Sequence, residues 1–249
     1  MIYGTFLLLG LAATGVSAVP LLPRQNSSTA DPNPPVTQDL LNQLELAATT
    51  VDRYTILKNK SPRYFKFDFN PAANPDVTVG GNKGAGGQGD LATRKKFPAL
   101  IGLNVAAAVG FLKPCGMNTP HVHPRATEIL TISQGTNIKT GFILENGLAS
   151  QISNTLSQYQ GAVFPMGSIH YEFNDNCEPA VFIAGFNSGD PGLSSIAQNF
   201  FGLDPNILEA DLGFPSQIDA GNIARFAVTI PPSFALGTRE CLDRCGIKY

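Results

Sequence analysis

All three histidines of this 249-residue chain fall in two short segments whose residue types and spacing suit metal binding. His121 and His123 are separated by a single residue. On a β-strand, alternate side chains point to the same face about 7 Å apart, so both imidazoles could reach one ion. Pro124 cannot donate to a strand ladder, and we expect the strand to end there.

A carboxylate and the third histidine complete the candidate site. On the next predicted strand, Glu128 has the parity of Leu130 and Ile132, so it should face the apolar interior. A carboxylate in such a place is costly unless it is paired or bound to a metal. A tight turn at residues 165–167 would present His170 from a further strand to the same interior.

Three imidazoles and one carboxylate form a mixed nitrogen and oxygen ligand set with room for water or a small substrate. Manganese, iron, zinc and copper all accept such a set, and the residues alone do not choose among them. The competing interpretation is that these are ordinary core or surface histidines. Because every histidine of the chain belongs to the pattern, we favour the metal site.

The elements that must position these residues are short strands. Between residues 100 and 189, apolar runs alternate with turn residues; the clearest are 105–112, 127–133, 139–144, 162–164 and 180–186. Evenly spaced short strands are typical of an all-β barrel or sandwich. No internal repeat is evident, so we predict one barrel, with its boundaries at residues 61–193.

The segments that flank this barrel have a different period. Leucines and other apolar residues recur at helical spacing behind a possible Thr37 cap, which predicts an N-terminal helical segment over residues 37–60. Residues 64–69 alternate and predict a strand. Residues 194–249 form the predicted C-terminal extension and tail, in which short helices are broken by Pro205 and Pro215.

The amino terminus predicts export. Residues 6–13 form a short apolar core, followed by a small-x-small cleavage pattern at 16–18, so residues 1–18 are expected to be a signal peptide. Residues 19–36 form a polar tether with a glycosylation sequon at Asn26. No apolar run is long enough for a membrane span, and we expect a secreted protein, extracellular or in the cell wall.

The four cysteines, an even number in a chain predicted to be secreted, indicate disulfides with three possible pairings. Cys241 and Cys245 are close in sequence, whereas Cys115 and Cys177 flank the two histidine segments. We favour pairing within each of these two groups. The alternative is that one or both pairs remain buried free thiols.

Composition excludes some classes of function. The formal net charge is −2, so no basic surface argues for nucleic-acid binding. Gly84, Gly86 and Gly89 match the G-x-G-x-x-G pattern of dinucleotide sites. No acidic residue follows at the required distance of about twenty positions, so we expect a flexible loop there.

Both histidine segments resemble the two motifs of the cupin family. The run from Pro120 to Glu128, with Gly135, is similar to the first motif, and the run from Gly161 to Asn174 is similar to the second. The first run is especially close to germins, germin-like proteins and spherulin-like secreted proteins. This resemblance implies a cupin jelly-roll barrel, a manganese ion bound by the three histidines and Glu128, and assembly into dimers or hexamers.

The resemblance also bears on activity. Oxalate-oxidising germins use two asparagines near the metal; Asn118 matches one, and Ala108 stands at the other position, which disfavours oxalate oxidation. We therefore expect a manganese oxidoreductase, a superoxide dismutase more than an oxalate oxidase, with Asn118 as the catalytic candidate. A dioxygenase or isomerase is a weaker option. The alternative from another class is a non-enzymatic structural or binding protein of the cell wall or spore coat.

Overall fold

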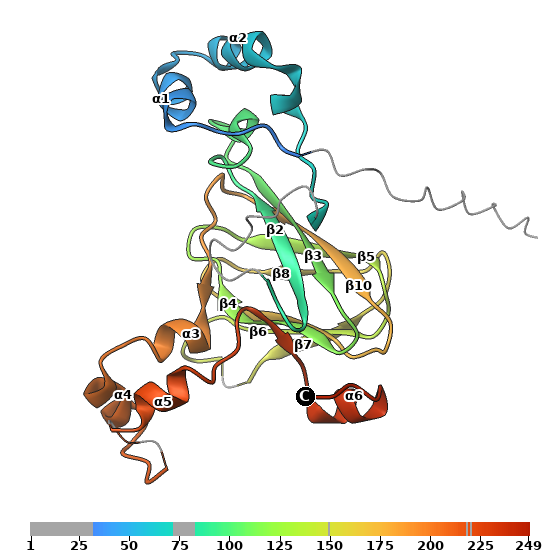
Figure 1. Cartoon of the computed structure of the whole chain (residues 1–249), viewed down its shortest axis with the longest axis vertical. Coiled ribbons are helices and arrows are strands. Elements are labelled where there is room, and N and C mark those ends of the chain that lie inside the picture. The colour runs from blue at the N-terminus through green and yellow to red at the C-terminus, as the bar shows by residue number, and fades with distance from the viewer. Residues whose placement is uncertain (1–31, 72–82, 149, 218, 220) are drawn as a thin grey trace, which may run out of the picture.

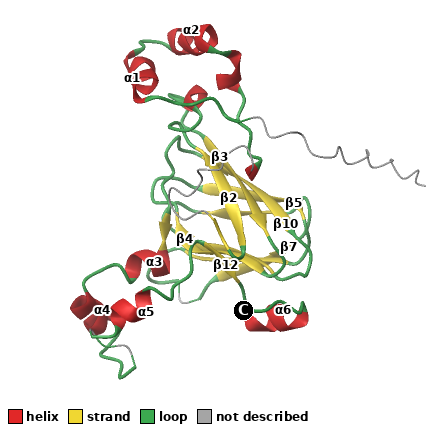
Figure 2. Cartoon of the chain, viewed as in Figure 1, coloured by secondary structure: helices red, strands yellow, loops and turns green. Residues whose placement is uncertain are grey.

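Two antiparallel β-sheets face each other and form the barrel at the centre of the molecule (Figure 1). The structure is a computed structural model that describes residues 32–71, 83–148, 150–217, 219 and 221–249. The predicted signal peptide, the Asn26 sequon and most of the predicted tether lie outside these residues. Figure 2 shows helices at both ends of the barrel.

One sheet has the order β1-β2-β3-β10-β5-β8. Its strands are β1 (Lys83–Gly84), β2 (Gly87–Ala92), β3 (Ala106–Leu112), β10 (Ala180–Phe186), β5 (Glu128–Gln134) and β8 (Gly161–Phe164). The other sheet has the order β11-β4-β9-β6-β7, and β12 pairs with β4 beside it. Its strands are β11 (Ser194–Ser195), β4 (Gly116–Val122), β9 (Ile169–Asn174), β6 (Ile138–Ile143), β7 (Ile152–Leu156) and β12 (Phe234–Leu236).

The barrel interior follows from the alternation of residues along each strand. On β5, Leu130 and Ile132 are fully buried, whereas Ile129 is 64% exposed on the outer face. Phenylalanines from two strands, Phe164 of β8 and Phe182 and Phe186 of β10, fill the space between the sheets. The predicted all-β jelly-roll barrel is confirmed, and each of the five apolar runs singled out in the sequence forms a strand.

The glycine-rich segment is not the flexible loop that we expected. It forms β1 and the start of β2, which pair as a hairpin. Gly86 lies directly against the C-terminal strand β12, because a Cβ added to Gly86 would be only 1.7 Å from the Ala235 carbonyl oxygen. The glycines therefore allow two backbones to approach closely, which is a structural reason for a G-x-G-x-x-G match.

The N-terminal segment forms two helices, α1 (Gln38–Leu46) and α2 (Thr50–Lys60), in place of the one predicted helix. Thr37 caps α1 as expected, since its hydroxyl accepts a hydrogen bond from the Leu40 amide at 3.2 Å. The strand predicted over residues 64–69 is wrong. Pro62 begins a 3-10 turn, η1 (Pro62–Phe65), and the following residues pair with no strand among those the structure describes.

These helices and a second 3-10 turn, η3 (Pro98–Leu100), share a small core separate from the barrel core; its buried members are Leu40, Leu44, Leu57, Tyr64, Ala99 and Ile101. At the other end, the C-terminal extension contains α3 (Ile196–Phe200), α4 (Pro205–Asp211), α5 (Ile223–Ala227) and α6 (Arg239–Arg244). Pro205 begins α4, with Asp204 as its cap. None of the described helices has both the length and the apolar character needed to cross a membrane.

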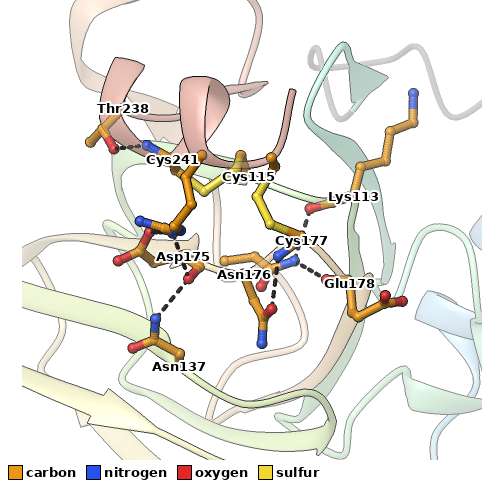
Figure 3. The surroundings of a disulfide bond; sticks show 12 residues. Lys113, Cys115, Asn137, Asp175, Asn176, Cys177, Glu178, Thr238 and Cys241 are labelled. Carbon is orange, nitrogen blue, oxygen red and sulfur yellow. Dashed lines mark hydrogen bonds and ion pairs between the residues drawn. A yellow bond between two sulfur atoms is a disulfide. The ribbon is translucent and has the colours of Figure 1, made fainter. Parts of the chain in front are cut away.

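Two disulfides attach α6 to the barrel, and their pairing differs from the one we favoured (Figure 3). Cys115 pairs with Cys241, and Cys177 pairs with Cys245. The helix explains the error. Residues four apart on a helix have Cβ atoms about 5–6 Å apart, whereas a disulfide needs about 3.5–4.5 Å. Cys241 of α6 and Cys245, which caps the C-terminus of this helix, each pair with a cysteine of the barrel instead.

The disulfides hold the ends of the two strands that carry histidines. Cys115 immediately precedes β4, and Cys177 follows β9 by three residues. An ion-pair cluster reinforces the same place, because Asp175 accepts hydrogen bonds from Arg244 of α6 and lies beside Lys139. The C-terminal helix therefore holds neighbouring ends of β4 and β9 together through two disulfides and an ion pair.

We predict that removing the Cys115–Cys241 bridge, by replacing both cysteines with serine, lowers the free energy of unfolding by about 2–5 kcal/mol. The bridge closes a loop with a sequence separation of 126 residues, so its loss increases the entropy of the unfolded chain. Denaturant titration measures the effect. An unchanged midpoint, or non-reducing peptide mapping that finds Cys241 joined to Cys245, would contradict this pairing.

Candidate metal centre

Four side chains converge inside the barrel from three strands and one strand end. His121 lies on β4, His170 on β9 and Glu128 at the start of β5, while His123 follows the last residue of β4. One possible ligand atom of each residue lies within 4.8 Å of those of the other three, and all four residues are buried. The structure thus brings together every residue that we predicted as a metal ligand.

A bulge in β4 determines which residues face the centre. His121 pairs with His170 across the sheet, but Asn118 pairs with Glu172, and the register shifts between these two pairs. Three steps along β4 therefore match two steps along β9. An odd step would normally place Asn118 and His121 on opposite faces, whereas the bulge lets both face the interior.

Each imidazole is held by a backbone carbonyl through its Nδ1 atom. Nδ1 of His121 lies 2.8 Å from the Thr119 oxygen, Nδ1 of His123 lies 2.5 Å from the Gly192 oxygen, and Nδ1 of His170 lies 2.9 Å from the Ser168 oxygen. A carbonyl can only accept, so each Nδ1 carries the proton. In the neutral ring this leaves the Nε2 lone pair free, the arrangement of metal-bound histidines.

The Nε2 atoms of the neutral rings then face the Glu128 carboxylate, and neither side supplies a proton for a hydrogen bond. Nε2 of His123 and Nε2 of His170 each lie 3.2 Å from Oε2 of Glu128. Lone pairs so close to a carboxylate repel unless a proton or a cation lies between them. A divalent cation removes this conflict for all four groups together, so the ligand set fits a metal ion.

Burial and neighbouring charges set the protonation of the site. Burial, together with the neighbouring histidines, lowers the pKa of His121 to about 3, so its imidazole is neutral and able to bind a metal. Burial alone would raise the pKa of Glu128, but its contacts with His123 and His170 lower it to about 2. Burial opposes protonation of His170, yet the hydrogen bond to Glu128 and the charge of Glu172 raise its pKa.

A small cavity opens beside these residues. Its space for water-sized molecules is about 50 Å³, which corresponds to roughly three or four waters. The wall is mostly apolar, with Ala108, Phe182, Ala184, Phe186, Leu193 and Phe234 around the metal ligands. Asn118 adds an uncharged polar side chain to this wall. Ala108 lies in the cavity, so a methyl group stands where the germin resemblance implied an asparagine.

Sequence analysis missed one residue of this region, Glu172. It is completely buried on β9, two residues after His170, and its Oε2 accepts a hydrogen bond from Nδ2 of Asn118 at 2.9 Å. Burial and the charge of Glu128 raise its pKa to about 8. A divalent cation at the centre would favour the charged form and oppose that rise. The parity argument applied to Glu128 would have found Glu172, because it shares the face of His170.

Comparison with known proteins places these features among relatives. Residues 74–218 match the family model described as Cupin. Spherulin-1B of Physarum polycephalum is 38% identical over 219 residues, which cover 88% of this chain and 83% of the spherulin. Germin-like protein 8-9 of Oryza sativa subsp. japonica is 38% identical over 164 residues, 65% of this chain and 72% of the relative.

Solved structures show the same fold. A recombinant oxalate oxidase in complex with glycolate superposes with a TM-score of 0.53 at 26% identity, over 60% of this chain and 74% of that chain. A second oxalate oxidase structure gives a TM-score of 0.57 at 23% identity, over 70% and 84% of the two chains. The second likeness concerns the fold alone.

We predict that His123→Ala reduces metal affinity by more than about 100-fold, because it removes one of four ligands and changing even the outer partners of such ligands costs 10–100-fold. Elemental analysis of the purified protein after metal loading and dialysis measures it. Asn118→Ala is the matched control and should keep its metal. Full metal retention in His123→Ala would reject His123 as a ligand.

Proposed function

Because this chain belongs to the cupin family, we propose that it binds one divalent metal ion, manganese, through its three histidines and Glu128. One observation carries the proposal. All three Nδ1 atoms are tied to backbone carbonyls, which leaves each Nε2 atom as a possible metal ligand beside the Glu128 carboxylate. The alternatives are iron, zinc and copper, which accept the same donor atoms. The resemblance to germins favours manganese.

We further propose that the protein is an oxidoreductase acting on a small molecule. A redox-active ion held by these residues would supply one-electron chemistry. The chain itself contributes a small and mostly apolar cavity beside the ligands, which has room only for small molecules. Asn118 would orient the ligand, since it is the uncharged polar side chain at the cavity wall.

Within this class, superoxide dismutation is favoured over oxalate oxidation. A solved relative of this fold is an oxalate oxidase in complex with glycolate, which makes a small acid a reasonable candidate. However, the wall opposite Asn118 presents the Ala108 methyl group, which cannot hydrogen-bond a carboxylate. Superoxide needs an accessible redox ion and less hydrogen bonding, so this substitution affects it less.

A non-enzymatic role in the cell wall or spore coat is the second candidate. Both disulfides and the three histidines lie on or next to the same strands, β4 and β9. An ion that binds only the folded chain adds its binding free energy to stability. Because the disulfides and the histidine ligands lie on or next to the same strands, the metal would add to the stability of the fold, as expected for a structural protein. The disulfides also support our proposal of export, because such bonds persist in oxidising compartments.

We predict that the purified protein contains about one manganese ion per chain and dismutates superoxide, with little oxalate turnover. The measurement is elemental analysis together with both assays on one sample. Metal-loaded Asn118→Ala should lose turnover and keep its metal. Stoichiometric metal without turnover of either substrate would contradict the enzymatic proposal and favour the structural role, and absence of metal after reloading would contradict both.

We also propose that the chain assembles into a homo-oligomer, a dimer or hexamer, through the outer face of the barrel. Ile129 is 64% exposed on β5, Val163 is 53% exposed opposite it on β8, and Ile183 is 48% exposed on β10. Neighbouring apolar side chains on an outer sheet face are typical of an interface.

Replacing Ile129 with Asp should therefore reduce the mass measured by light scattering after gel filtration, because it places a charge in an apolar contact. Val51→Asp, at an exposed position of α2, is the control and should leave the mass unchanged. A monomeric wild-type protein, or an assembly that tolerates Ile129→Asp, would contradict this interface.

A further inference from the structure

The metal site does not require the hydrogen bond between Asn118, a half-buried residue of the cavity wall, and Glu172, a buried residue behind it. Glu172 lies between β4 and β6, paired across the sheet with Asn118 on one side and Thr140 on the other. Its exposed fraction is zero. Its Oε2 accepts from Asn118, and its Oε1 has no hydrogen-bond partner among the described residues. Glu172 does not line the cavity, whereas Asn118 does.

This pair orients the Asn118 amide. A carboxamide has a donor end and an acceptor end, and Nδ2 of Asn118 is turned toward Glu172 at 2.9 Å. When a cation at the centre keeps Glu172 charged, the opposite orientation would place two acceptor oxygens in contact, which is unfavourable. With its nitrogen held behind the wall, the amide turns its carbonyl oxygen, Oδ1, toward the cavity.

We infer that Glu172 is a positioning residue that makes Asn118 a hydrogen-bond acceptor at the cavity, so that the site selects small ligands carrying an O–H over carboxylate dianions. This inference rests on the proposed metal centre and deepens it by naming the ligand class. A carboxylate has only acceptor oxygens and would meet the Asn118 oxygen without a shared proton. A hydroxyl, a hydroperoxyl group or a water molecule can donate to it.

Ala108 strengthens the same selection. A dianion such as oxalate needs donors from the wall in addition to the ion, and the Ala108 methyl group supplies none. The rest of the wall is largely aromatic or aliphatic, and its further polar side chain beside the metal ligands and Asn118 is the buried carboxyl of Asp90. A negatively charged ligand would therefore lose its hydration without regaining hydrogen bonds, which costs free energy.

The test is the affinity of the manganese-loaded protein for oxalate, without oxygen, measured by calorimetry together with the metal content of each variant. We expect Asn118→Ala to leave oxalate binding unchanged or to tighten it, because an opposing carbonyl is removed. Weakening by about threefold or more, the loss of one ordinary hydrogen bond, would show that Asn118 donates to the anion and would overturn the inference.

Glu172→Gln tests the positioning role directly. The glutamine side chain can donate as well as accept, so the Asn118 amide is free to turn its N–H toward the cavity. We expect oxalate affinity to rise about three- to tenfold, and we expect this gain to disappear when Asn118 is also alanine. Glu178→Gln, the same change at an exposed residue six positions away, is the control and should have no effect.

The outcomes separate three possibilities. A gain that persists in the Asn118→Ala background would mean that Glu172 acts by its charge alone, which overturns the positioning role. No gain in metal-loaded Glu172→Gln would overturn it as well. If Glu172→Gln does not fold, the sign of the Asn118→Ala effect still decides the inference. Failure of the wild-type protein to bind metal would instead contradict the proposed function.

Discussion

The buried charge of Glu128 is the constraint on which the rest of the site depends. A carboxylate that is 2% exposed inside an apolar barrel loses several kcal/mol of hydration, and the interior must compensate it. Neutral imidazoles that present lone pairs cannot do so by themselves. Their Nδ1 protons are already committed to three backbone carbonyls, so a cation shared by all four groups is the simplest compensation. The backbone carbonyls therefore determine what the side chains can bind.

The position of the four ligands depends in particular on strands β4 and β9. β4 must carry His121 and Asn118 on one face although they are three residues apart, and only a bulge permits this. β9 must hold His170 opposite. The C-terminal strand β12 pairs with β4 at Asn118, and α6 is bridged to both strands through disulfides. The C-terminal extension thus fixes the geometry of the site from outside the barrel.

The inward-facing residues of the strands and the metal ligands could be predicted from the sequence, because both depend on local periodicity. Strand parity placed Glu128 inside, and histidine spacing identified the ligand set. The same parity places Glu172 beside His170, although an isolated glutamate attracted no attention. Strand β7 has four exposed residues in succession, so it shows no alternation that a sequence pattern could reveal.

The errors involve partners that are distant in sequence. The short separation of Cys241 and Cys245 in the sequence favours a bond between them, but helix α6 directs both toward cysteines of the barrel. The glycine-rich composition of β1 and β2 predicts a flexible loop, whereas the small size of these glycines is needed against β12, about 150 residues later. In the same way, the bulge in β4 exists only in relation to its register with β9, which no local pattern specifies.

The two proposed roles share the stabilising effect of the metal and differ in what else the site needs. The histidine ligands and the disulfides lie on or next to the same pair of strands, β4 and β9, so metal loading should raise stability whether or not the protein is an enzyme. A structural ion needs only its ligands. It does not need a cavity beside it, nor an amide whose orientation is fixed by a buried carboxylate that costs stability to keep there. The Asn118–Glu172 pair therefore argues for ligand chemistry at the centre, since durability alone would be served better by an apolar residue at position 172.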